Sequence, residues 1–180
     1  MKRMILLTLL QLFLALAFTA ARAEDQRGTA PRFTEAKSIV DRIDRDLRSL
    51  KLSSQTFETG TDRGGKIAIY RQDSGVVRID LTVGLSNADR RDVFYYSMGN
   101  LIFVRNKKVR YPYSESKGFD FQKPETVFQS QYYAVGHELT PVGKSEKLDA
   151  ATVFSLIRDA EYLMRAVENN QQIDGGRLMK

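Results

Sequence analysis

The side chains with the clearest potential for binding chemistry lie in a basic and aromatic stretch between residues 105 and 113. It contains Arg105, Lys107, Lys108 and Arg110, followed by Tyr111 and Tyr113. Guanidinium and ammonium groups pair with phosphate or carboxylate, and aromatic rings stack on sugars and cations. A structural alternative is that these charges protect an edge strand from pairing with another chain. The stretch is therefore a candidate contact for an anionic partner.

His137 is the single histidine, and imidazole is the one side chain that titrates near neutral pH unaided. A general base or metal ligand needs further converging groups, and the neighbouring sequence offers no orienting carboxylate. We expect instead an exposed residue at a hairpin tip. The chain has no cysteine, glycine-rich phosphate loop, paired histidine metal motif or nucleophile elbow. We therefore expect no enzyme activity and no cofactor, although a pair of catalytic carboxylates would leave no sequence signature.

Acidic and amide side chains in one predicted turn raise the question of a calcium site. Asn87, Asp89 and Asp92 supply oxygen atoms of the type that calcium prefers. They lack the spacing of a calcium-binding hand and its final glutamate, and Arg90 and Arg91 would repel a cation. Asx-turn chemistry explains the same residues, so we expect a turn and no metal site.

The N-terminus has the pattern of a cleavable secretory signal. Lys2 and Arg3 precede the apolar run 4–18, and small residues follow it. A short positive segment, an apolar run and a small-residue cleavage site are typical of secretory signals. Residues 1–23 are therefore predicted to be a signal peptide that is removed on export.

An uncleaved membrane anchor is the alternative interpretation of this N-terminus. The apolar run is shorter than the roughly twenty residues that a spanning helix needs, and no cysteine is present for lipid attachment. We expect a periplasmic or secreted protein with no stable membrane anchor after cleavage. Loss of the three basic residues of the signal lowers the formal net charge from +6 to +3. That charge does not predict the concentrated basic face of a nucleic-acid-binding protein.

The remaining chain is predicted to form one α+β domain with a helix at each end. A flexible leader is expected over 24–33, and apolar residues at three- and four-residue spacing predict a helix from Thr34 onward. Alternating apolar residues and glycine-bearing turns then predict an antiparallel meander of about seven strands. The expected strands are Ser54–Thr59, Lys66–Gln72, Val76–Gly84, Asp92–Ser97, Leu101–Val109, Thr126–Ala134 and Glu138–Val142.

A second amphipathic helix is predicted after Asp149, which is a suitable N-cap, and its apolar stripe ends at Val167. Its charged residues lie largely away from the stripe, which indicates one buried and one exposed face. The domain is therefore placed at 34–168. Residues 169–180 carry no such stripe and are predicted to be a flexible tail.

Two neighbouring predicted strands carry apolar residues on both faces, so both faces must be covered. Strict alternation groups Phe94 with Tyr96 and, on the next strand, Ile102 with Val104. One possibility is that a helix packs on each face and completes an ordinary core. The other is that these four side chains line a cavity for an apolar ligand.

Several segments resemble a loose group of uncharacterised exported bacterial proteins. The resemblance rests on the signal and first helix, on Gly64–Tyr70 and Val76–Asp80, and on the paired tyrosines of two hairpins. It implies a curved antiparallel sheet between two helices and brings no known activity. More distantly, the chain resembles periplasmic carriers of the outer-membrane lipoprotein pathway, which form an unclosed β-barrel around lipid. It differs from those carriers in lacking tryptophan.

We expect a non-catalytic exported binding protein that acts on a cell-envelope component: an envelope protein, a lipid or an anionic polymer. The residues expected to bind are the paired tyrosines and the basic stretch, namely Tyr95, Tyr96, Tyr132, Tyr133, Arg105, Lys107, Lys108 and Arg110. One alternative is a carrier that holds a lipid or other apolar molecule in the cavity described above. Another is an inhibitor or immunity protein of a wall-degrading enzyme, which would insert an exposed loop such as Gly84–Arg91.

Overall fold

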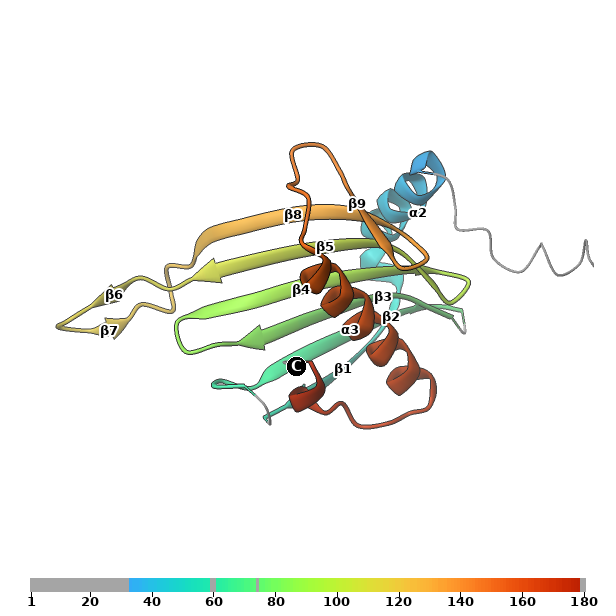
Figure 1. Cartoon of the computed structure of the whole chain (residues 1–180). Coiled ribbons are helices and arrows are strands. Elements are labelled where there is room, and N and C mark those ends of the chain that lie inside the picture. Colours follow the sequence, from blue (N-terminus) through green and yellow to red (C-terminus); the bar gives the residue numbers. More distant parts are fainter. Residues whose placement is uncertain (1–32, 59–60, 74, 179–180) are drawn as a thin grey trace, which may run out of the picture. The chain divides into compact units, whose positions relative to one another are not determined.

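The computed structural model describes residues 33–58, 61–73 and 75–178. The predicted signal peptide and all but the last residue of the predicted leader lie outside the described residues. Within them, the chain forms the α+β fold expected from the sequence, with an antiparallel sheet and one helix toward each end (Figure 1).

A single meandering sheet of seven antiparallel strands forms the body of the fold. Each strand pairs with the next of these strands along the chain, in the order β1-β2-β3-β4-β5-β8-β9. Short turns suffice for such neighbours, which explains the glycines and Asx residues between the apolar runs. The strands are β1 Lys51–Phe57, β2 Gly65–Gln72, β3 Gly75–Gly84, β4 Ala88–Ser97, β5 Asn100–Arg110, β8 Glu125–Val135 and β9 Glu138–Pro141.

A small separate hairpin lies between β5 and β8 and extends past the end of the sheet (Figure 1). Its strands are β6, Tyr113–Ser114, and β7, Gly118–Phe119. The Tyr113 and Phe119 rings pack with their centroids 5.1 Å apart, and both side chains remain exposed. The hairpin is therefore held by local aromatic contacts rather than by the main core.

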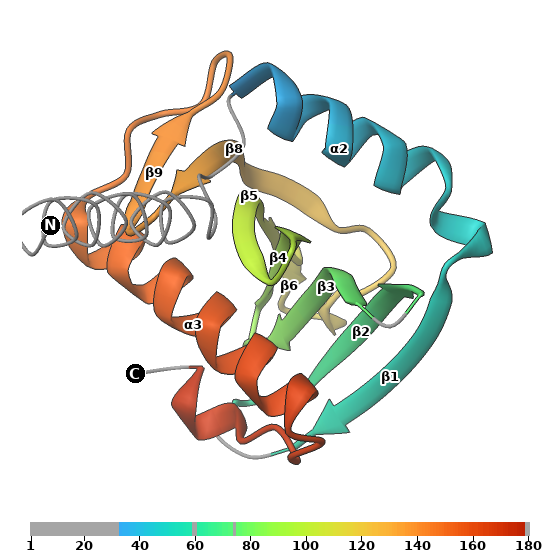
Figure 2. The same ribbon diagram turned by 90° about the vertical axis from the view of Figure 1, so that its right-hand side faces the viewer.

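The two helices lie on opposite faces of the sheet (Figure 2). They are α2, Phe33–Arg45, and α3, Ala150–Glu168. Two short 3-10 turns, η1 at Leu47–Ser49 and η2 at Gly175–Arg177, follow them. No helix in the described part of the chain has the length and apolar character required to cross a membrane.

Each helix completes a separate hydrophobic core with the face that it covers. Helix α2 buries Ala36, Val40 and Ile43 against Tyr95 and Phe103. Helix α3 covers the other face, and its core includes Leu156, Ala160, Leu163, Ile79, Leu81, Phe94 and Tyr96. Both apolar faces of the central strands are therefore packed against helices, which is the ordinary-core arrangement.

A β-bulge changes the face that one residue of β5 presents. Tyr95 pairs with Phe103 but Tyr96 pairs with Leu101, so Ile102 is the extra residue on its strand. Such a bulge interrupts the strict alternation of side chains. Ile102 therefore packs with Phe103 on the α2 face, and the predicted grouping of Ile102 with Val104 is wrong.

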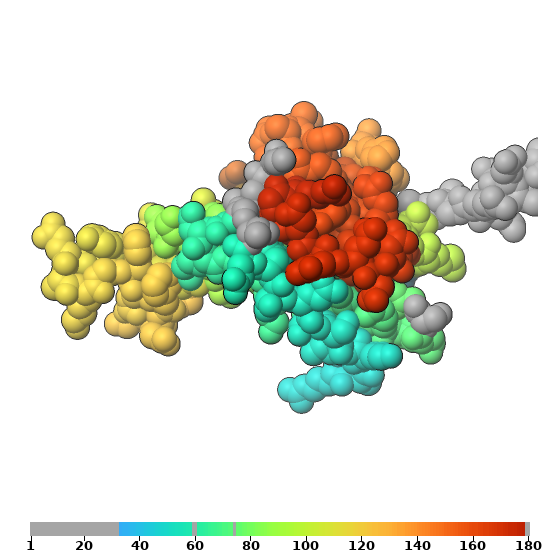
Figure 3. Space-filling model, turned by 90° about the horizontal axis from the view of Figure 1, so that it is seen from below, coloured from blue at the N-terminus to red at the C-terminus, as the bar shows by residue number. Residues whose placement is uncertain are grey.

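The segment after α3 is part of the folded domain, in contrast to the flexible tail predicted for it. Ile173 and Leu178 are buried and join the α3 core. The backbone N–H of Asp174 donates to the Tyr162 hydroxyl at 2.8 Å, which fastens the segment to α3. The space-filling view shows this C-terminal segment lying against the helix (Figure 3). The predicted tail contains only three apolar residues, Ile173, Leu178 and Met179, too few and too unevenly spaced to give a periodic signal.

Strand β4 begins at Ala88, so the acidic residues predicted to form a turn lie mostly inside a strand. Asp89 is buried, and its carboxylate accepts hydrogen bonds from Arg63 at 2.5 Å, Arg91 at 3.0 Å and the Tyr111 hydroxyl at 2.5 Å. Because Gly84 ends β3, the connection is only 85–87, which leaves little loop for the proposed insertion into an enzyme.

This Asp89 cluster predicts a pH-dependent contribution to stability. Burial alone would raise the pKa of Asp89, but the hydrogen bonds from Tyr111 and Arg91 and the charge of Arg63 outweigh it and lower the pKa below 3.8. The carboxylate therefore stabilises the fold above pH 3.8, and the contribution is lost as the pH falls through the folded-state pKa. Asp89→Asn should lose about 1.5–3 kcal/mol of unfolding free energy at neutral pH.

Urea unfolding of the wild type and of Asp89→Asn over a pH series measures this effect. The two stability curves should be separated at pH 7 and should converge as the pH falls below 3.8. A separation that stays constant across the acidic range would show that the charge of Asp89 contributes nothing.

Candidate functional site

The four tyrosines predicted to contact a partner are buried in the two cores. Tyr95, Tyr96, Tyr132 and Tyr133 are each at most 4% exposed. Three of the hydroxyls donate internally: Tyr95 to Asp44, Tyr96 to the Ala160 carbonyl and Tyr132 to the Glu146 carbonyl. Burial also raises the pKa of the Tyr96 hydroxyl well above its usual value. These side chains hold the fold together and present no surface to a partner.

The apolar side chains predicted to line a ligand cavity are also core residues. Phe94, Ile102 and Val104 have no exposed surface. Phe94 and Val104 belong to the α3 core with Tyr96, whereas Ile102 belongs to the α2 core. The four residues therefore do not surround one cavity.

The basic stretch does not form a single patch, because strand alternation divides it between the two faces of the sheet. Arg105 pairs with Asp44 of α2 at 2.7 Å, and Lys107 follows on the same face. Lys108 lies on the α3 face, where it lines a cavity with Arg90. Arg110, at the end of β5, lies 3.5 Å from Glu125 in an exposed ion pair.

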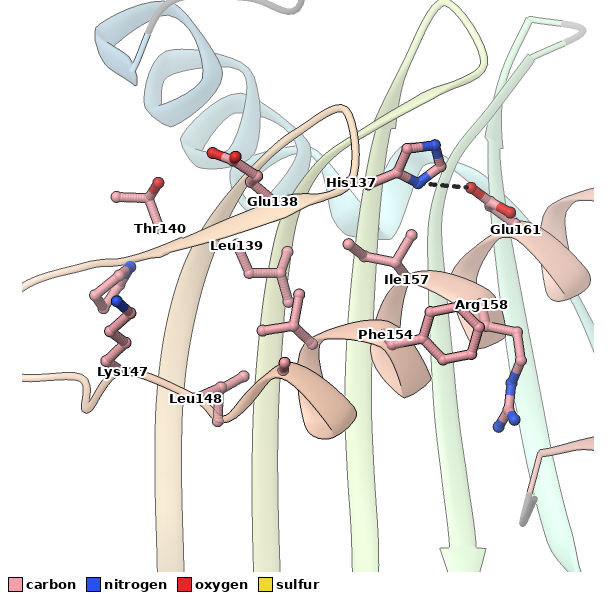
Figure 4. A pocket seen from close by; sticks show the side chains of 13 residues that line it. His137, Glu138, Leu139, Thr140, Lys147, Leu148, Phe154, Ile157, Arg158 and Glu161 are labelled. Atoms are coloured by element: carbon pink, nitrogen blue, oxygen red, sulfur yellow. Dashed lines mark ion pairs between the residues drawn. The ribbon is translucent and has the colours of Figure 1, made fainter.

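A groove of about 880 Å³ lies between hairpin β8–β9 and the first half of α3. Figure 4 shows Leu139 of β9 and Ile157 of α3 directed toward the same space, with Phe154 beside them. The apolar side chains of the lining are Leu139, Pro141, Leu148, Val153, Phe154 and Ile157. Polar and charged residues of both signs complete the lining, among them Lys147, Arg158 and Glu138. The groove is thus apolar inside with charged groups around it.

Phe154 is the most informative residue of this groove. Its side chain is 68% exposed, although phenylalanine is one of the residue types most often buried. Asp149 begins the helix by accepting a hydrogen bond from the Thr152 N–H at 2.9 Å, which fixes where each following residue points. Phe154 then lies outside the apolar stripe of α3 that packs on the sheet. Hairpin β8–β9 forms the wall of the groove opposite Phe154. One sequence feature could have indicated this groove: Phe154 is a large aromatic residue outside the predicted apolar stripe of the C-terminal helix.

His137 lies at the β8–β9 turn, as predicted, and its side chain is 84% exposed. Its Nδ1 is 3.7 Å from the Glu161 carboxylate of α3, across one end of the groove (Figure 4). No sequence pattern indicates this carboxylate, because Glu161 lies on a helix that is distant from His137 in the sequence. Among residues 33–58, 61–73 and 75–178, no group of three or more histidine, aspartate or glutamate side chains is placed to hold a metal ion.

Comparison of the chain with known protein families, with curated protein sequences and with solved structures finds no match. The resemblance to exported proteins and to lipoprotein carriers therefore stays a prediction. Function has to be argued from the chemistry of the described cavities, because a fold by itself does not define an activity.

Proposed function

We propose that this chain is a non-catalytic binding protein of the cell envelope that holds a small apolar molecule in the groove between hairpin β8–β9 and helix α3. The sequence analysis offers a carrier of an apolar ligand as one alternative, with the ligand at the central strands. The present proposal keeps that function but assigns the ligand to a different part of the fold. Its exported location rests on the predicted signal peptide. The observation that carries the proposal is the exposed Phe154 ring in the apolar groove.

The size and chemistry of the groove support a small-molecule ligand. Its volume of about 880 Å³ lies in the range of roughly 300–1,000 Å³ that is typical of ligand pockets. Burial of apolar surface from both ligand and groove would provide the main driving force. A single exposed phenylalanine is not unusual on a protein surface, but here it adjoins Leu139, Val153 and Ile157 in one concavity.

The charged lining favours a ligand with a polar end. Lys147 precedes α3, and Arg158 follows one turn after Phe154. The Lys147 ammonium can meet the polar or anionic end of an amphipathic molecule while the apolar part of that molecule lies against Phe154, whereas the Arg158 guanidinium is paired with Asp159 at 3.0 Å. A fatty acyl chain or an aromatic compound with one polar group has this chemistry.

Fluorescence titration with N-phenyl-1-naphthylamine, an uncharged apolar probe, tests the proposal. The probe should bind the wild type, and Phe154→Glu should weaken binding about tenfold or more, since a charge would enter the apolar groove. Phe154 is largely exposed, so this variant should fold. The matched control is Leu52→Glu, because Leu52 is also exposed, at 58%, but lies on the edge strand β1.

Equal probe affinities for Phe154→Glu, Leu52→Glu and the wild type would contradict the assignment of the groove. Loss of binding in both variants would point to general surface hydrophobicity rather than to this site. Circular dichroism of each variant establishes that the comparison is made between folded proteins.

A further inference from the structure

We propose that a second cavity, on the other side of the first half of α3, binds a small organic anion with an apolar body. This cavity has a volume of about 570 Å³ and lies between α3 and strands β4, β5 and β8. Its polar lining includes Arg90, Asn106, Lys108 and Ser155. The proposal does not depend on the ligand groove at Phe154.

Two basic residues that line this anion cavity occupy neighbouring positions on adjacent strands. Arg90 of β4 is directly opposite Lys108 of β5 in the sheet register, and Lys108 is directly opposite Phe128 of β8. Like charges in directly opposed positions repel each other and destabilise a sheet. The carboxylates of Asp92 and Asp159 neutralise Arg90 and thereby relieve this repulsion.

The two cations differ in how their charges are balanced. Arg90 lies 2.5 Å from Asp92 and 2.8 Å from Asp159, two fully buried carboxylates. Asp159 also pairs with Arg158 at 3.0 Å. Lys108 has no carboxylate within 4.0 Å among the described residues. The ammonium group of Lys108 is therefore the one available for an anionic ligand.

The buried polar groups beneath the cavity hold its floor in place. The Asn106 side-chain amide donates to Asp92, on the strand next to it. Asp92 is fully buried, and this burial raises the pKa of its carboxyl group. Buried charges are costly unless they are paired and hydrogen-bonded. Here they hold the Arg90 guanidinium between Asp92 and Asp159, which leaves Lys108 as the cation of this cavity without a carboxylate partner among the described residues.

Apolar side chains form the remaining walls and define the kind of anion. Leu85, Phe128 and Leu156 line the cavity together with the polar groups. A bare inorganic anion would leave these side chains in contact with water. An aromatic or alkyl carboxylate, sulfonate or phosphate would cover them while its charge met Lys108.

Fluorescence titration with 1-anilinonaphthalene-8-sulfonate tests this site, because the probe joins a sulfonate to an aromatic body. The assay is made in the Phe154→Glu background, so that the groove does not contribute. Lys108→Gln should weaken binding about tenfold, since it removes the free positive charge. Lys108 is exposed, so the substitution should leave the fold intact.

Lys107→Gln is the matched control. Lys107 is adjacent in the same strand and faces Arg91 in the same register, but its side chain lies on the opposite face. This variant should bind the sulfonate probe as the background protein does. Inorganic sulfate should compete with the probe only weakly, because it cannot cover the apolar walls.

Amide chemical shifts locate the probe independently of affinity. Binding should shift the backbone amide signals of Asn106, Ser155 and Leu156. Equal affinities for Lys108→Gln and Lys107→Gln, or shifts confined to hairpin β8–β9, would overturn the proposal. Neither result would bear on the binding of the uncharged probe at Phe154, so the two sites fail or succeed separately.

Discussion

Phe94→Ala should lower the free energy of unfolding by about 3–5 kcal/mol, the cost of removing a large aromatic side chain from a packed core. Phe94 is fully buried in the core that α3 forms with the sheet. Phe154→Ala should change stability by less than about 0.5 kcal/mol, because the ring is mostly in water. Urea unfolding of both variants measures the difference.

The same pair of variants should behave in the opposite way in ligand binding. Phe154→Ala should weaken binding of N-phenyl-1-naphthylamine, whereas the folded fraction of Phe94→Ala should bind it with the affinity of the wild type. This result would separate a core phenylalanine from a ligand-binding one. A stable Phe94→Ala protein that no longer binds the probe would instead favour the alternative of a ligand cavity at the central strands.

The fold could be predicted from the sequence because its determinants are local and repetitive. In β3, Ile79, Leu81 and Val83 are buried and the residues between them are less so, which gives the period of two that marks a strand. Asp149 caps α3 as expected. Neighbouring antiparallel strands need only short turns, so the order of the meander follows directly from the order of the strands.

Errors arose where one residue or one distant contact decides the structure. The β-bulge at Ile102 places this side chain on the α2 face, and no residue type in the sequence marks the position of the bulge. Ile173 and Leu178 are buried only because α3 and the sheet provide surfaces for them. Sequence periodicity reports a buried face but not which partner covers it.

The candidate sites were harder to predict than the fold because they are formed between elements that are distant in sequence. The groove joins Leu139 of β9 to Phe154 of α3, and the anion cavity joins Lys108 of β5 to Ser155 of α3. The sequence marks Lys108 as one of several charged candidates, and strand alternation places it on the face opposite to Arg105. The sequence predicts the paired tyrosines as binding groups, whereas all four are buried and three of their hydroxyls donate to internal partners.

Asp44→Ala should be the most destabilising substitution of an acidic residue in α2. Its carboxylate accepts from Arg78 at 2.8 Å and from the Tyr95 hydroxyl at 2.8 Å, and it pairs with Arg105 at 2.7 Å. Removing it leaves partly buried cations without this partner. Because the Asp44 side chain is 29% exposed, we expect a loss of about 2–3 kcal/mol, less than for a fully buried pair.

Asp41→Ala provides the control within the same helix. Asp41 pairs with Lys37 at 2.7 Å, but both side chains are at least half exposed, and exposed pairs contribute little to stability. Urea unfolding should therefore separate the two alanine variants, and hydrogen exchange should show faster opening of α2 only in Asp44→Ala. Equal stabilities would mean that apolar packing of Val40 and Ile43 alone fastens the helix. A lower stability of Asp44→Ala than of Asp41→Ala would instead show that Asp44 provides the polar attachment of α2 to the sheet. Its carboxylate joins the end of the helix to three strands, through Arg78 of β3, Tyr95 of β4 and Arg105 of β5.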